Sequence, residues 1–379
     1  MRKLINAIVK CIKMPKHILW ERYVKGRQKM NYDLVKKIAK ENMETCDACR
    51  ICDTRKCAGM IPGPGGKGTG STSIRNCQFW RDRVKLNMDV LMEPTFGGHE
   101  AYGDVDTSFH IFDTDLRLPV MAAPIGLVDQ NWGKKHDEYS YAKAVLEGCE
   151  MAGTFAFTGG GAKKESFTSP LAAMVDSGIK GVPTIKPWEM PIVEERMRIM
   201  ASQGIKYFAM DIDSAGLPNA NTSEHKMMLK SPADITNICD FADVLGMRFI
   251  VKGVMTVKTA YHMVRAGAYS IVVSNHGGRA MDDGLSTGEV LKNIRNAVGN
   301  KTRVLVDGGI RTGNDVVKAI ALGADGVLIG RPVAIAAYGG NAQGVAMFMN
   351  KIQYEMVEVM KMTGCRNIND IDESIITMV

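Results

Sequence analysis

The stretch SIVVSNHGGR, residues 270–279, joins a short apolar run to a turn that contains a histidine, two glycines and an arginine. A continuous apolar run is typical of a parallel strand that is buried on both faces. At its end, His276 can take a proton near neutral pH, and Arg279 can bind a carboxylate through two parallel hydrogen bonds. Reactive side chains that follow a buried strand are typical of an α/β barrel, in which chemistry gathers at the carboxyl ends of the strands.

The same alternation of apolar run, glycine-rich loop and helical stretch continues on both sides of this segment. Eight apolar runs fit the pattern, at residues 119–123, 154–158, 182–185, 207–212, 249–251, 270–273, 304–306 and 326–329. Eight strand–helix units over about 210 residues match the size of a (β/α)8 barrel. A doubly wound sheet is the alternative, but it requires a Gly-x-Gly-x-x-Gly turn after its first strand, and the sequence PIG at 124–126 is not one.

We therefore expect an α/β fold built from three parts. Residues 1–45 form a basic helical segment, residues 46–114 form a Cys- and Gly-rich extension that packs on the barrel, and residues 115–379 form the (β/α)8 barrel itself. The long stretch between the fourth and fifth strands, residues 214–248, is a candidate lid over the catalytic face.

Two glycine-rich loops follow the last two strands, DGGIRTG at 307–313 and IGRP at 329–332. Loops at these two positions form the usual phosphate-binding cradle of such barrels, and Arg311 and Arg331 would supply it with positive charge. Lys252 follows the fifth apolar run and is expected to point into the barrel mouth. A buried ammonium group at that place is unfavourable unless it meets an anion.

The segments 252–254, 274–279 and 307–331 resemble those of the FMN-dependent 2-hydroxy-acid oxidases and dehydrogenases, the family that includes lactate oxidase and glycolate oxidase. The resemblance covers about residues 115–365. It implies an FMN held in the barrel and the oxidation of an L-2-hydroxy acid, such as lactate, to a 2-oxo acid.

Carried over to this sequence, the resemblance implies that His276 takes the substrate hydroxyl proton while hydride passes to the flavin, and that Asp213 pairs with the imidazolium. It implies that Arg279 holds the substrate carboxylate and that Lys252 lies at the flavin pyrimidine edge, where it stabilises negative charge on the reduced ring. The other cofactor contacts that it implies are Ala122, Ala123, Pro124, Ser274, Asp307, Gly309, Arg311, Gly330 and Arg331.

The sequence also departs from the family pattern around the substrate. Lys186 stands where the family has a tyrosine at the end of the third strand, Asp211 replaces a threonine, and Gly159 replaces a serine. Residues 214–246 lack the second carboxylate-binding arginine, and residues 33–101 lack the N-terminal tyrosine. We expect the redox machinery to be kept and the substrate clamp to be rebuilt, with Lys186 as a substitute partner for the carboxylate.

The positive charge of the chain is confined to its beginning. Residues 1–30 hold nine lysines and arginines and one acid, whereas the rest of the chain holds 39 bases and 40 acids. This balance excludes a nucleic-acid footprint over the body of the protein. The basic head is expected to be a solvated terminus or a contact with an anionic membrane surface, unless Met30 is the true start. Without a signal-peptide pattern, a cytoplasmic location is expected.

Four cysteines lie within twelve residues, at Cys46, Cys49, Cys52 and Cys57. Their spacing is compatible with a tetrathiolate site for zinc or an iron–sulfur cluster, with redox-active thiols near the flavin, or with incidental thiols in a loop. If the cluster carries electrons, the protein would act as a dehydrogenase that passes them to a partner.

Two other functions compete with hydroxy-acid oxidation. One is another FMN-barrel chemistry, such as that of the type 2 isopentenyl diphosphate isomerases, which would not need the pair of His276 and Arg279. The other is a flavin or metal sensor that uses the cysteine cluster. The expected partners are a small 2-hydroxy acid and an electron acceptor, either oxygen or a redox protein. The resemblance also implies a homo-oligomer, a tetramer.

Overall fold

The structure is a computed structural model that describes residues 31–43, 70–89, 105–161, 163–217, 226–281 and 283–379. Its centre is a closed barrel of eight parallel strands, in which each strand pairs with the next along the chain and the last pairs with the first. The barrel strands are β4 (Val120–Ala122), β5 (Ala156–Thr158), β6 (Gly181–Ile185), β7 (Tyr207–Asp211), β8 (Arg248–Val254), β9 (Ser270–Val273), β10 (Arg303–Val306) and β11 (Gly326–Ile329). Each of the eight predicted apolar runs forms one of them, so the predicted (β/α)8 barrel is confirmed.

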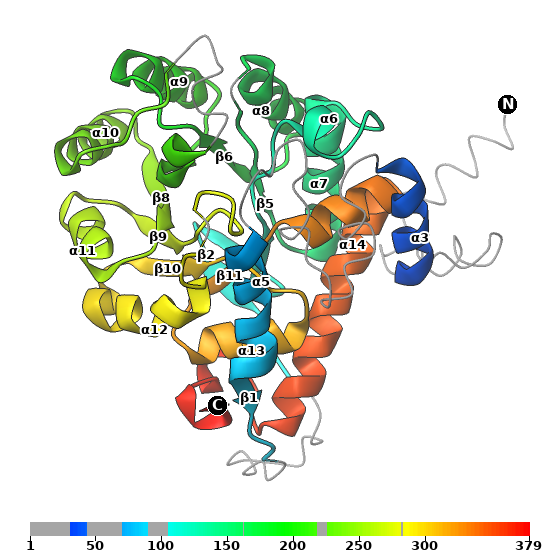
Figure 1. The fold of residues 1–379 in the computed structure, drawn as a ribbon. Coiled ribbons are helices and arrows are strands. Elements are labelled where there is room, and N and C mark those ends of the chain that lie inside the picture. The colour runs from blue at the N-terminus through cyan, green and yellow to red at the C-terminus, as the bar shows by residue number, and fades with distance from the viewer. Residues whose placement is uncertain (1–30, 44–69, 90–104, 162, 218–225, 282) are drawn as a thin grey trace, which may run out of the picture.

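Helices alternate with these strands and surround the barrel (Figure 1). They are α6 (Val128–Asn131), α7 (Glu138–Ala152), α8 (Glu165–Ser177), α9 (Met190–Ser202), α10 (Pro232–Val244), α11 (Val257–Arg265), α12 (Thr287–Val298), α13 (Gly313–Ala321) and α14 (Arg331–Met362). Several begin at a capping box, for example at Ser286 of α12 and Thr312 of α13, because a hydroxyl there satisfies an orphan backbone N–H group. Helix α14 is kinked at Gly340 and Asn341.

Two apolar layers hold the barrel together. Along β4, Met121 faces the barrel interior, whereas Val120 and Ala122 face the helices. The interior closes at its amino end under a hairpin of β2 (Phe109–Ile111) and β3 (Thr114–Leu116), which inserts Phe112 among the rings of the barrel wall. The amino end is therefore filled with side chains, and only the carboxyl ends of the strands remain for chemistry.

The described parts of the N-terminal region lie against the barrel. Helix α3 (Tyr32–Asn42) runs beside α14, where Gly339 allows the backbone of Val35 to approach (Figure 1). Helix α5 (Gly70–Gln78) leads through η2 (Phe79–Arg83) into β1 (Val84–Leu86), which pairs with the last strand, β12 (Ile376–Met378).

Three sequence expectations fall wholly or partly outside the described residues. The cysteines at 46, 49, 52 and 57 lie outside them, and so does the basic head, residues 1–30. Part of the candidate lid, residues 218–225, is also outside. In the part of the chain that the structure describes, no helix is long and apolar enough to cross a membrane.

Candidate active site

The predicted site residues meet at the carboxyl end of the barrel. Lys186 follows β6, Asp213 lies in η3 (Ile212–Gly216) after β7, and Lys252 lies within β8. Strand β8 continues to Val254, beyond its predicted end, with an irregular pairing to β9 at this point. Ala122 ends β4, Ala123 and Pro124 follow it, and Arg331 begins α14. The remaining residues lie in the loops after β9, β10 and β11: Ser274, His276, Arg279, Asp307, Gly309, Arg311 and Gly330.

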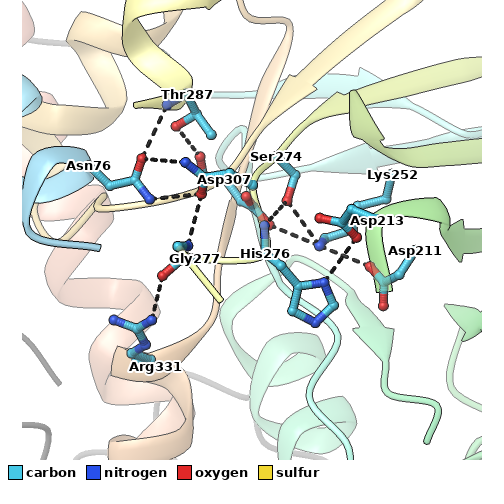
Figure 2. Close-up of polar contacts among 12 residues, drawn as sticks. Asn76, Asp211, Asp213, Lys252, Ser274, His276, Gly277, Thr287, Asp307 and Arg331 are labelled. Carbon is cyan, nitrogen blue, oxygen red and sulfur yellow. Dashed lines mark hydrogen bonds and ion pairs between the residues drawn. The ribbon is translucent and has the colours of Figure 1, made fainter. Parts of the chain in front are cut away.

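His276 and Asp213 form a hydrogen-bonded pair, with 3.0 Å between Nδ1 and Oδ1 (Figure 2). Because a carboxylate only accepts, the pairing places a proton on Nδ1 and leaves the Nε2 lone pair available as a base. The backbone of His276 has a φ of 58°, a strained conformation for a residue with a side chain, and such strain is concentrated at functional sites. Gly253 makes room for the pair, because a Cβ atom there would lie 2.8 Å from Cγ of Asp213.

A buried network of charges lies beside this pair. The Nζ atom of Lys252 is 2.9 Å from Asp211, 3.3 Å from Asp307 and 3.1 Å from the hydroxyl of Ser274 (Figure 2). On its other oxygen, Asp211 accepts a hydrogen bond of 2.7 Å from Lys186. Burial raises the pKa of Asp211, but the two ammonium groups outweigh burial and hold that pKa well below its usual range. The predicted need of Lys252 for an anion is thus met by two aspartates.

Arg279 differs from these residues because no described residue pairs with it directly. Among the described residues, its guanidinium makes no hydrogen bond and no ion pair, and its Nε atom is fully enclosed without a partner. Burial and the charge of Arg331 together lower its pKa to about 10, although the carboxylates of Asp211 and Asp213 oppose this shift. A guanidinium group held this way is unfavourable by itself, and a carboxylate would stabilise it through two parallel hydrogen bonds.

The loop that carries His276 and Arg279 is fastened by helix α5. The amides of Asn76 and Asn275 bond to each other in both directions, at 2.8 and 2.9 Å. Asn76 also accepts the backbone N–H of Thr287, at the start of α12. These contacts join α5 to a loop about 200 residues later in the chain. These contacts could not be predicted, because nothing in the local sequence pattern near residue 76 indicates its distant partners.

We expect the replacement Asn76→Ala to lower the free energy of unfolding by about 2–4 kcal/mol, since it leaves the amide of Asn275 and the N–H of Thr287 buried with one partner fewer. Urea denaturation followed by circular dichroism measures the loss. The replacement Asn293→Ala, at an exposed position on α12, is the matched control and should change stability little. Equal stabilities of the two variants would show that the paired amides do not hold the loop.

The loop after β4 is held by a carboxylate from α7. Glu138 accepts a hydrogen bond of 2.9 Å from the backbone N–H of Val128, at the start of α6. Burial raises the pKa of Glu138 to about 6. The folded state therefore favours the protonated form, and keeping the ionised form destabilises the fold.

The replacement Glu138→Gln is expected to gain stability over the parent as the pH rises. The cost of ionising Glu138 is absent below its ordinary pKa of 4.5 and complete above about 6. At about 1.4 kcal/mol for each pKa unit, the difference in unfolding free energy should grow by about 2 kcal/mol across that interval. Denaturation curves at a series of pH values between about 4 and 7 measure it. A difference that stays constant over this range would contradict the buried state of the carboxylate.

The residues of the barrel mouth suit a bound polar ring system with a phosphate. Several buried polar atoms there have no hydrogen-bond partner among the described residues, including the hydroxyls of Thr158 and Thr184 and one oxygen of Asp307. Such orphaned atoms are rare in folded proteins and indicate a missing ligand. The two threonines were not predicted as site residues, because Thr158 ends an apolar run and Thr184 lies within one. Gly330 directly precedes α14, and the amino end of a helix favours a bound anion.

Two residues of the expected phosphate cradle already have protein partners. Arg331 donates to the hydroxyl of Ser73 at 2.7 Å and to the carbonyl of Gly277 at 2.6 Å. Arg311 donates to the carbonyl of Ile310 at 2.8 Å. Their charge still lies next to the two glycine-rich loops, so they raise the affinity of this end of the barrel for an anion.

The carboxylates and the imidazole could also suggest a metal site. Ligand atoms of Asp211, Asp213 and His276 lie within 4.8 Å of one another. The ammonium groups of Lys186 and Lys252 both contact Asp211, however, and their positive charge opposes the binding of a metal cation at this place.

Comparison with known proteins agrees with this geometry. The family model for FMN-dependent dehydrogenases matches residues 202–378. L-lactate oxidase from Lactobacillus jensenii is 40% identical over 148 residues, which cover 39% of this chain and 36% of that protein. L-lactate dehydrogenase from Pectobacterium atrosepticum is 45% identical over 130 residues, 34% of each chain. The matched segments thus span about a third of the length of these relatives.

A solved structure extends the likeness to the rest of the chain. A mandelate oxidase mutant with a monooxide FMN adduct superimposes with a TM-score of 0.65 and 26% identity, covering 83% of this chain and 94% of that one. The match includes the strands that precede residue 202, so the barrel as a whole is shared. Residues 202–378 thus match the family of FMN-dependent dehydrogenases, and the chain as a whole is similar in fold to mandelate oxidase.

Proposed function

We propose that this protein oxidises a small L-2-hydroxy acid to the corresponding 2-oxo acid with FMN as the bound cofactor. The observation that carries the proposal is Arg279, which has no hydrogen-bond or ion-pair partner among the described residues and lies three residues after a histidine whose Nε2 is available as a base. A carboxylate on the cation would bring the neighbouring hydroxyl of a 2-hydroxy acid to the base. The names of the relatives, lactate oxidase and lactate dehydrogenase, support the same reaction class.

The cofactor would be held by the carboxyl ends of the strands. Ala122, Ala123 and Pro124 would provide backbone contacts on one side, and Ser274, Lys252 and Asp307 polar contacts at the edge. Gly309, Arg311, Gly330 and Arg331 would surround the phosphate. When bound, FMN accepts the hydride that leaves the carbon bearing the hydroxyl group.

The side chains of the chain handle the proton and the charge. His276 takes the hydroxyl proton at Nε2 and becomes an imidazolium, and the carboxylate of Asp213 stabilises that cation through Nδ1. Lys252 keeps its proton, because Asp211 and Asp307 outweigh the effect of burial and raise its pKa. It is therefore a fixed positive charge at the place where negative charge develops.

The substrate clamp contains fewer cations than the family pattern implies. Arg279 is the one arginine of this loop, and the described part of residues 214–246 supplies no second one. Lys186, expected to contact the carboxylate, donates instead to Asp211 in the structure. Any contact of Lys186 with the substrate stays a prediction and would use its two remaining N–H groups.

An anaerobic absorbance titration of the purified protein with a panel of L-2-hydroxy acids tests the proposal. The starting spectrum should show bound FMN, and one acid should bleach it. Reoxidation by air would then identify an oxidase, and its absence a dehydrogenase with a protein or quinone acceptor. A flavin that no acid reduces would exclude hydroxy-acid oxidation and favour other FMN-barrel chemistry.

We also propose a metal or redox role for the cysteine segment, a membrane contact for the basic head and a homo-oligomeric state. Metal analysis of the protein and of a variant with the four cysteines at 46, 49, 52 and 57 replaced by serine tests for zinc or iron. Sedimentation with anionic vesicles tests the membrane contact of residues 1–30, and light scattering tests for a homo-oligomer.

A further inference from the structure

Two departures from the family pattern meet in the structure. Lys186 replaces a tyrosine and Asp211 replaces a threonine, and the two residues are 25 positions apart in the chain. Strand β6 pairs with β7 through Ile185 and Met210, so the register carries Lys186 to the side of Asp211. The next strand, β8, pairs Lys252 with Asp211 itself. Three neighbouring strands thus place a lysine, an aspartate and a lysine in one row.

The two replacements depend on each other. Asp211 is 2% exposed and Lys186 is 8% exposed, so without Asp211 the ammonium group of Lys186 would be buried with no other ion pair among the described residues, and without Lys186 the carboxylate would be left with Lys252. Together they form a close ion pair, with 2.7 Å between Nζ and Oδ2. The pair adds no net charge to the site, but it places the negative member between the two lysines, 2.9 Å from Nζ of Lys252.

We propose that Asp211, held in place by Lys186, offsets the positive charge of Lys252 and thereby lowers the reduction potential of the bound flavin. The inference rests on the proposed function, in which Lys252 lies at the edge of the flavin where negative charge develops on reduction. A cation there stabilises the reduced ring, and a carboxylate that contacts this cation removes part of the stabilisation. Since both groups are buried, solvent screens their interaction only weakly.

The direction of the effect separates this role from a structural one. The replacement Asp211→Asn keeps the shape of the side chain and removes the negative charge, so the flavin midpoint potential should rise. The replacement Lys186→Met removes the positive charge that balances Asp211, so the potential should fall. The double replacement restores the original net charge and should return the potential close to that of the parent protein. Simple damage to the site would move both single variants in the same direction.

The measurement is the midpoint potential of FMN in the intact protein, obtained by slow enzymatic reduction in the presence of reference dyes at pH 6, where lysine ammonium groups keep their protons. We expect at least a tenfold change in the equilibrium between oxidised and reduced flavin for each single variant. For a two-electron couple this corresponds to about 30 mV. The exposed pair of Lys292 and Glu373, 2.7 Å apart, provides the matched controls Lys292→Met and Glu373→Gln, which should shift nothing.

Shifts of opposite sign that cancel in the double variant support the inference. No shift, or shifts of the same sign, in variants that bind FMN would overturn it. If Asp211→Asn does not fold, the pair Lys186→Met and Lys186→Tyr/Asp211→Thr keeps the test decisive. The first should lower the potential, and the second, which restores the uncharged residues of the family, should leave it near the parent value.

The outcome is independent of the substrate, because the reduction in this experiment does not use a hydroxy acid. If the parent protein binds FMN but no 2-hydroxy acid reduces this flavin, the proposed function is wrong. The midpoint potentials of the variants would still test the role of Asp211. Conversely, rapid reduction by a hydroxy acid together with unshifted potentials would keep the function and reject the role of Asp211.

Discussion

Replacing His276 with glutamine is expected to lower kcat/KM for the 2-hydroxy acid by about 10³-fold, the usual contribution of a well-placed general base. Glutamine keeps a polar side chain of similar length but cannot take the hydroxyl proton. FMN binding should persist, because the described hydrogen bonds of the His276 side chain run to Asp213 alone. Stopped-flow reduction of the flavin under anaerobic conditions measures the chemical step without interference from the electron acceptor.

His110 offers a matched control. It also pairs with a carboxylate, Asp115 at 2.7 Å, but it is exposed and lies on the β2–β3 hairpin at the opposite end of the barrel. The replacement His110→Gln should leave flavin reduction unchanged. Comparable reduction rates for the parent and His276→Gln proteins would remove His276 from the proton transfer, whatever the effect on stability.

The replacement Arg279→Met is expected to act in opposite directions on activity and on stability. Without the guanidinium, the substrate carboxylate loses its charge-assisted hydrogen bonds, and kcat/KM should fall by about 10²–10³-fold, mainly through KM. Without substrate, the protein should become more stable by about 1 kcal/mol, because a cation whose Nε atom is enclosed without a partner among the described residues is replaced by an apolar side chain of similar length. Steady-state kinetics and urea denaturation of the same preparations measure the two effects.

Arg295 is the contrasting arginine. Its guanidinium is paired with Asp325 and bonds to the carbonyl of Gly323 at 2.6 Å, so Arg295→Met should destabilise the fold without a direct effect on KM. A loss of stability in both variants would contradict the unpartnered state of Arg279. An unchanged KM in Arg279→Met would exclude it as the carboxylate contact.

The fold and the position of the candidate site could be predicted because both depend on local features of this sequence. Each barrel strand is a short apolar run, and such a run by itself predicts a strand that is buried on both faces, between the helices and the barrel interior. The reactive residues follow those runs directly, as His276 follows β9 and Lys252 lies in β8. Since all strands are parallel, their ends meet at one place, and chain position alone brings the residues together.

Contacts between distant segments could not be predicted. The pairing of Lys186 with Asp211 depends on the register between β6 and β7, which the sequence of neither strand specifies by itself. The bond between Asn76 and Asn275 joins segments that no periodicity connects. The same holds for the hairpin that closes the amino end, whose Phe112 has a positive φ that no turn glycine announces.

The pairing of β11 with β4 also determines when the barrel can close during folding and whether a fragment of the chain can fold alone. Val120 of the first strand lies opposite Val327 of the last, so the ring closes only after most of the chain has been synthesised. Until then β4 offers an open edge, and contacts of such long range form slowly. The stretch that the family model recognises begins after β6 and contains β7 to β11, five of the eight barrel strands. Expressed alone, this fragment would have two unpaired edge strands and an incomplete interior, and we expect it to aggregate under conditions in which the whole chain folds.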